Sequence, residues 1–131
     1  MSSNQQAGFQ TEIEFELPKG FVDESGDLHR RGTMRLATAA DEILPLRDPR
    51  VQQNEAYLAV IVLARVITRL GNLGEIHTGV IENLFASDLA YLQRLYERFN
   101  ASGEEESAVD LNGENFTNGK SMRRFAALGE A

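Results

Sequence analysis

Apolar and acidic residues alternate near the start of the chain, and this alternation predicts a β-strand. Uncharged side chains, most of them large and apolar, occupy every second position from Phe9 to Leu17, with glutamates between them at positions 12, 14 and 16. Because successive side chains of a strand point to opposite faces, the pattern predicts one buried face and one acidic face. Proline donates no backbone hydrogen bond, so residues 18–20 (Pro-Lys-Gly) predict a bulge or kink before Phe21 and Val22 resume the strand.

A second strand is predicted after a turn, which gives a β-hairpin over residues 9–37. Residues 23–27 (Asp-Glu-Ser-Gly-Asp) are typical of a turn, because Asp bonds its own backbone and Gly adopts positive φ. Two faces are expected on the return strand: Leu28, Gly32, Met34 and Leu36 on one, and His29, Arg31, Thr33 and Arg35 on the other. Cross-strand pairs of opposite charge contribute about 0.2–1 kcal/mol each, so a solvated sheet face is the first interpretation and a charged partner-binding strip the alternative.

Helical periodicity and capping residues predict helices over about 39–44, 49–70, 79–85 and 88–99. The expected N-caps are Thr38, Asp48, Thr78 and Ser87. Asp41 and Glu42 fall in a first turn, where the helix dipole favours anions, so capping is preferred to acid–base chemistry for this pair. Apolar residues surround the 49–70 helix, which predicts a central buried position with Gly71 as its C′ residue.

Arg65 and Arg69 are four residues apart and are expected to share one face of that helix. The first interpretation is that their stems pack and their charged ends reach solvent or the region of Glu82 and Asp88. A binding site for an anion is the alternative.

Together these elements predict one α+β domain over residues 9–100, in which the hairpin packs on a small bundle of three to four helices. The 131 residues fit a single domain. Residues 1–8 and 101–131 are polar or rich in Gly, Glu, Asn and Ser, and are expected to be disordered. Residues 121–128 differ from the rest of this tail: Met122, Phe125 and Leu128 are spaced by three around two arginines, so a short amphipathic segment or an inert end is expected.

Composition narrows the classes of partner and of chemistry. The net charge of −7 argues against nucleic acid or an anionic membrane as the main partner, because both select basic surfaces. Cysteine is absent, which leaves no disulfide or thiolate and fits the cytoplasm. The most apolar run, residues 57–66, is too short to span a membrane. Neither His29 nor His77 lies in a catalytic or metal-binding motif, so we expect no enzyme activity, no metal and no cofactor.

The hairpin-to-helix block and two later segments resemble a known family. The block runs from Phe21 through the turn to Met34-Arg-Leu-Ala-Thr-Ala-Ala-Asp-Glu42, and it is followed by Leu63-Ala-Arg-Val-Ile-Thr-Arg-Leu-Gly71 and Val80-Ile-Glu-Asn-Leu-Phe-Ala-Ser-Asp-Leu89. These segments are similar to those of the tail assembly chaperones of Mu-like and P2-like contractile-tail phages and of related injection systems. The resemblance covers roughly residues 15–100.

This resemblance implies a role in tail assembly in the cytoplasm of a bacterial host. Such a chaperone keeps the tape-measure protein soluble, helps to recruit tail tube subunits and is usually absent from the finished particle. The candidate client contacts are Tyr91, Tyr96 and Phe99 on the last helix, and Met122, Phe125 and Leu128 in the tail. Core and rim packing is the first interpretation of the three helix aromatics.

Two other functions stay open at this point. One is a structural or adaptor component of a contractile tail or injection particle, and the other is a small acidic binding protein unrelated to phages. Self-association is also open, because the outer strand of the hairpin is an exposed edge whose glutamates either prevent strand pairing or accept a docking strand.

Overall fold

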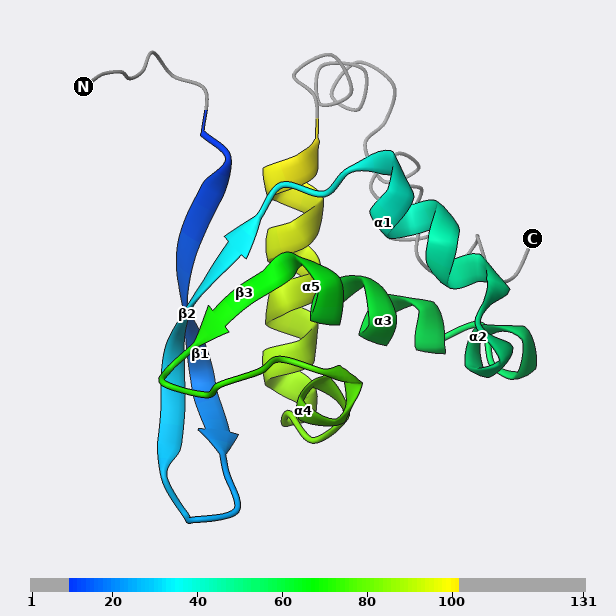
Figure 1. Cartoon of the computed structure of the whole chain (residues 1–131). Helices are drawn as coiled ribbons and strands as arrows, with labels where there is room; N and C mark the ends of the chain where they lie inside the picture. Colours follow the sequence, from blue (N-terminus) through cyan, green and yellow to red (C-terminus); the bar gives the residue numbers. More distant parts are fainter. Residues whose placement is uncertain (1–9, 102–131) are drawn as a thin grey trace.

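The computed structural model describes residues 10–101 and shows an α+β fold (Figure 1). The predictions for residues 1–8 and for the tail from residue 102 onward therefore lie outside the described residues. The elements follow in the order β1 (Glu12–Val22), β2 (Leu28–Arg35), α1 (Ala39–Ile43), the 3-10 helix η1 (Leu44–Arg47), α2 (Pro49–Gln53), α3 (Tyr57–Val66), β3 (Ile67–Leu70), α4 (Thr78–Glu82) and α5 (Ala86–Asn100).

The three strands form one antiparallel sheet in the order β1-β2-β3. Apolar side chains on one face of the sheet meet the helices, with α5 packed against β1 and with α3 in contact with α4 and α5 (Figure 1). The most deeply buried apolar side chains come from all of these elements: Leu17, Met34, Leu58, Val62, Leu63, Val66, Leu70, Ile81 and Leu92. A single core between sheet and helices therefore holds the domain together.

The predicted bulge in β1 is confirmed. Glu16 pairs with Arg31 and Phe21 pairs with His29, so four residues of β1 lie opposite one residue of β2. Gly20 has a φ of 106°, a conformation that other residues rarely adopt. The extra residues change which side chains face the core at this end of the hairpin.

The prediction for the start of β2 is wrong for the same reason. Leu28 was expected on the same face as Met34 and His29 on the opposite face, but Met34 and His29 are buried and Leu28 is 56% exposed. Arg30 and Arg31 are both exposed, so the period-two alternation that holds from Gly32 to Met34 is not continuous with the hairpin tip. A bulge on the neighbouring strand breaks this alternation, and the pattern of β2 alone does not reveal it.

The single helix predicted over residues 49–70 is wrong, because three elements occupy that range: α2, α3 and β3. Asn54 ends α2 in an extended conformation (φ −149°, ψ 103°), and its side-chain oxygen accepts a hydrogen bond from the backbone N–H of Ala56. Such local side-chain bonding competes with a continuing helix. Ile67 and Thr68 are β-branched residues, and pairing with β2 draws them into a third strand.

The other predicted helices are confirmed with shifted boundaries. Asp48 caps α2 as predicted, since its carboxylate accepts a hydrogen bond from the backbone N–H of Arg50 at 2.8 Å. The helices α4 and α5 begin one or two residues earlier than predicted, and their N-caps are His77 and Phe85 instead of Thr78 and Ser87. At His77 the ring nitrogen Nδ1 accepts from the N–H of Gly79 at 3.1 Å.

Asp41 connects three elements of the domain. Its carboxylate is 2% exposed and accepts hydrogen bonds from the backbone N–H of Thr38 at 2.8 Å, from Arg35 on β2 at 2.8 and 3.0 Å, and from Nε of Arg65 on α3 at 2.9 Å. Asp41 has the predicted capping role at the start of α1, and it also forms ion pairs with Arg35 and Arg65. Arg65 therefore pairs with Asp41 and not with Glu82 or Asp88, and its side chain is 37% exposed, in agreement with the expectation that its charged end reaches solvent.

These contacts make the stability of the fold depend on pH. The hydrogen bonds from Arg35 lower the pKa of Asp41 well below its ordinary value of 3.8, helped by the bonds from Thr38 and Arg65 and opposed by burial. A depressed folded-state pKa contributes stability that is present above pH 3.8 and is lost as the pH falls toward the folded value.

We expect Asp41→Asn to lower the free energy of unfolding at neutral pH by about 2–3 kcal/mol, below the usual cost of breaking a buried ion pair because both arginines are about a third exposed. The variant should also lose less stability than the wild type when the pH falls below 3.8. Urea unfolding at a series of pH values measures both effects. Equal acid sensitivity of the two proteins would contradict this assignment.

Candidate partner-binding site

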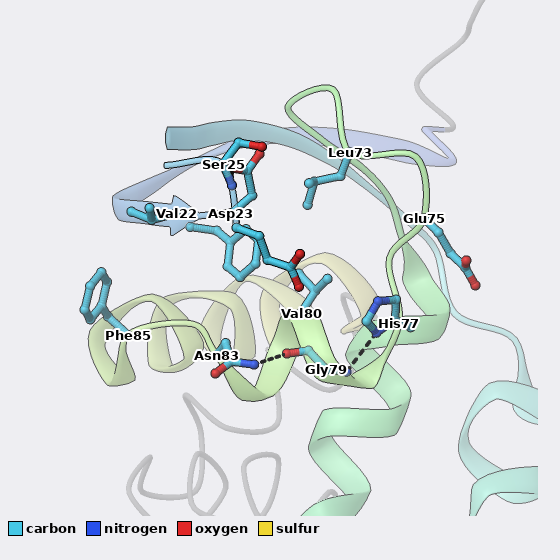
Figure 2. A pocket seen from close by; sticks show the side chains of 12 residues that line it. Val22, Asp23, Ser25, Leu73, Glu75, His77, Gly79, Val80, Asn83 and Phe85 are labelled. Carbon is cyan, nitrogen blue, oxygen red and sulfur yellow. Dashed lines mark hydrogen bonds between the residues drawn. The ribbon is translucent and has the colours of Figure 1, made fainter. Parts of the chain in front are cut away.

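A cleft of about 730 Å³ lies between the tip of the hairpin and α4 (Figure 2). Three segments line it: the hairpin tip at residues 21–25, residues of the loop after β3 between positions 73 and 77, and α4 with the short connection to Phe85 at the start of α5. The cleft therefore joins parts of the chain that are about 50 residues apart in sequence. We refer to it as the tip cleft.

Apolar side chains form much of the surface of the tip cleft. Val22 is 50% exposed and Phe85 is 51% exposed, and Figure 2 shows both at the same end of the pocket. Leu73 and Val80 face the middle of the pocket from its two sides. Exposed apolar side chains that gather at a concave surface are typical of a site for a protein or peptide partner.

The charged groups of the tip cleft are acidic. Asp23, Glu24 and Glu75 line it, and within residues 10–101 no lysine or arginine does so. A hydrogen bond from His29 lowers the pKa of Asp23, with further bonds from the backbone N–H groups of Asp27 and Ser25, so this carboxylate is charged at neutral pH. The electrostatic potential of the cleft therefore favours a basic partner.

Asp23 and His29 fix the shape of the hairpin tip. The Asp23 carboxylate accepts hydrogen bonds from the backbone N–H groups of Ser25 at 2.8 Å and Asp27 at 3.0 Å. Its Oδ2 atom also accepts a hydrogen bond from Nε2 of His29 at 2.8 Å, because an ionised carboxylate only accepts. The His29 ring packs beneath Gly71, where an added Cβ would come within 2.1 Å of Nδ1. The tip is thus tied to the loop after β3.

Asp88 joins the two walls of the tip cleft. It lies in the first turn of α5, three residues after Phe85, and is fully buried. Its two carboxylate oxygens accept hydrogen bonds from the backbone N–H groups of Lys19 at 2.9 Å and Gly20 at 2.8 Å, in the bulge of β1. One side chain therefore positions both Phe85 and the strand that carries Phe21 and Val22.

Sequence reasoning missed both the tip cleft and the role of Asp88. The pattern indicated an aspartate in a first turn and a bulge at residues 18–20, but no sequence signal connects elements 68 residues apart. Val22 and Phe85 were treated as strand and helix residues, and only their exposure in the folded domain distinguishes them from core residues.

The client contacts that were predicted on α5 differ in their exposure. Tyr96 is 3% exposed and its hydroxyl donates a hydrogen bond to the carboxylate of Glu42, so the prediction that it is a surface contact is wrong. Packing against the core gives the physical reason, because the face of α5 that carries Leu92 and Tyr96 points inward.

Tyr91 and Phe99 are half-buried and pack against the core, and their role in partner binding stays a prediction. Tyr91 lines a separate hollow of about 500 Å³ beside Phe15 and Gly32, away from the tip cleft. The three tail residues Met122, Phe125 and Leu128 lie outside the described residues.

Within residues 10–101, no group of three or more His, Asp or Glu side chains is arranged to hold a metal ion. In the same part of the chain, no helix has the length and apolar character needed to cross a membrane. His29 and His77 both have structural partners there, the former in Asp23 and the latter in the N-terminal turn of α4. The arrangement of the tip cleft suits non-covalent binding.

Comparison with known proteins gives no significant match: no family model, no characterised protein and no solved structure matches the chain. The resemblance to tail assembly chaperones therefore rests on the three sequence segments within residues 21–89 alone.

We expect Asp88→Ala to lower the free energy of unfolding by about 3 kcal/mol, because it removes the acceptor of two hydrogen bonds and leaves the buried N–H of Gly20 and the partly buried N–H of Lys19 unpaired. Asp88→Asn keeps one acceptor oxygen but places an NH2 donor against the second backbone N–H, so it should also destabilise the fold. Urea unfolding measures these values, and Ser87→Ala at the exposed neighbouring position is the control. If Asp88→Ala unfolds like the control, Asp88 does not hold the bulge.

Proposed function

We propose that this protein is a non-catalytic assembly chaperone that binds a client protein in the tip cleft. The observation that carries the proposal is the combination of exposed Val22 and Phe85 with an acidic rim. Such a surface favours a client segment that presents apolar side chains with basic residues beside them. The net charge of −7 keeps the chaperone soluble and lets it repel other copies of itself.

The resemblance to tail assembly chaperones supplies the identity of the client. On that basis we propose the tape-measure protein of a contractile tail or injection particle as the main client, with the tail tube protein as a second one and the bacterial cytoplasm as the setting. A long client that is prone to aggregation before assembly needs its apolar segments covered. It must also be released later, which favours a moderate affinity.

The size of the apolar contact fits such a reversible complex. Val22 and Phe85 are each about half exposed, so complete burial by a client would contribute roughly 1 kcal/mol per side chain. Because 1.4 kcal/mol corresponds to a factor of about ten in the dissociation constant, losing both contacts should weaken binding by more than tenfold. This change is large enough to detect in a co-purification experiment.

The test is co-expression of the tape-measure protein encoded beside this chain with tagged Val22→Ser/Phe85→Ser. We expect the amount of soluble client that co-purifies to fall about tenfold relative to the wild type, because the apolar contacts of the tip cleft are lost. Melting temperatures of the purified variants check that the fold persists, since both side chains are exposed.

The matched control is Ile43→Ser/Leu44→Ser. These two side chains are 59% and 43% exposed but lie at the end of α1 and the start of η1, outside the tip cleft. We expect the control to retain its client. Equal losses in both double variants, or no loss in either, would show that the tip cleft is not the client site.

A further inference from the structure

We propose that, in the absence of a client, residues 120–128 of this same chain occupy the tip cleft. The inference rests on the proposed function, because it concerns the same surface and adds a mechanism that regulates access to it. The segment lies outside the described residues.

The segment and the tip cleft have opposite charges. Lys120, Arg123 and Arg124 contribute three positive charges within five residues, in a chain whose net charge is −7. In the part of the chain that the structure describes, the cleft presents the carboxylates of Asp23, Glu24 and Glu75 and no lysine or arginine. No other five consecutive residues of the sequence include three lysines or arginines. Charge complementarity therefore favours this segment as an occupant.

The apolar residues of the segment match the apolar surface of the cleft. Met122, Phe125 and Leu128 recur every third position, a spacing that places side chains near one another on a helical face. The cleft offers Val22 and Phe85, each about half exposed, with Leu73 and Val80 between the two walls. Covering these side chains would remove apolar surface from water, at about 25 cal/mol per Å².

The covalent connection permits this contact. α5 (Ala86–Asn100) follows directly after Phe85 at the tip cleft, so its 15 residues carry the chain about 22 Å away from the cleft. The intervening residues 102–119 can span at most roughly 60 Å. A tethered segment within reach has an effective concentration on the order of millimolar, so even weak intrinsic binding fills the site.

An internal occupant changes how a client binds. The apparent dissociation constant of the client equals its intrinsic value divided by the fraction of open clefts, so a cleft closed in nine molecules of ten weakens client binding about tenfold. Val22 and Phe85 would also be shielded from other copies of the chain before the client arrives. The client must therefore carry a stronger version of the same apolar and basic pattern.

The absence of cysteine in the chain permits a direct test. A nitroxide is attached to Ala127→Cys in the otherwise complete chain, and the loss of intensity of backbone amide signals is measured by NMR without any client. We expect strong broadening at Val22, Gly79 and Phe85, which disappears when the nitroxide is reduced. A nitroxide at Ala108→Cys, in the acidic part of the tail, is the matched control and should broaden these amides much less.

Reversing the charges on the segment and on the cleft tests whether the contact depends on their complementary charges. Arg123→Glu/Arg124→Glu should abolish the broadening, and adding Glu24→Lys/Glu75→Lys to that variant should restore it. Unbroadened cleft amides with the label at position 127, or equal broadening from position 108, would overturn the proposal. Broadening that persists in a mixture of labelled and isotope-enriched chains would also overturn it, because the occupant would then be a second copy.

This experiment and the co-purification test can fail separately. In one outcome the cleft amides broaden, but the client co-purifies with Val22→Ser/Phe85→Ser as well as with the wild type. This result supports the internal contact and rejects the proposed function. A client lost from that variant, with no broadening from position 127, supports the proposed function and rejects the internal occupant.

Discussion

The buried carboxylate of Asp88 is the constraint on which the proposed binding surface depends. It sits in the first turn of α5 and accepts the backbone N–H groups of Lys19 and Gly20 in the bulge of β1. A bulge releases backbone donors from the ladder, and a buried donor without a partner is costly. A side chain of α5 therefore accepts the hydrogen bonds of the backbone N–H groups that the bulge leaves unpaired. These bonds fix the two walls of the tip cleft relative to each other.

Two other aspartates extend the same principle to the rest of the domain. The carboxylate of Asp41 accepts hydrogen bonds from Thr38, Arg35 and Arg65, and these bonds connect α1 to β2 and α3. Asp23 organises the hairpin tip through backbone N–H groups and His29. Charge-assisted hydrogen bonds of this kind are directional, so they specify positions that apolar packing alone would leave adjustable. These three aspartates thus have structural roles, while Glu24 and Glu75 remain exposed at the cleft.

The sequence allowed the α+β class, the hairpin and the bulge to be predicted, because alternation, turn residues and proline act locally. It did not predict β3, since Ile67 and Thr68 continue a helical pattern and become a strand only through pairing with β2. Local patterns also misplaced Leu28 and His29, whose orientation follows from a bulge on the neighbouring strand. The tip cleft could not be predicted at all, because it requires the hairpin tip, the loop after β3 and the start of α5 to meet in space.

The central claim is that the tip cleft contacts the client, and hydrogen–deuterium exchange on the co-purified complex with the tape-measure protein tests it most directly. The claim predicts that client binding slows exchange in residues 21–25 and 73–85, while residues 39–47, which carry the exposed Ile43 and Leu44, exchange as in the free protein. Slowed exchange confined to residues 39–47 or to the second half of α5, with unchanged exchange around the tip cleft, would contradict it.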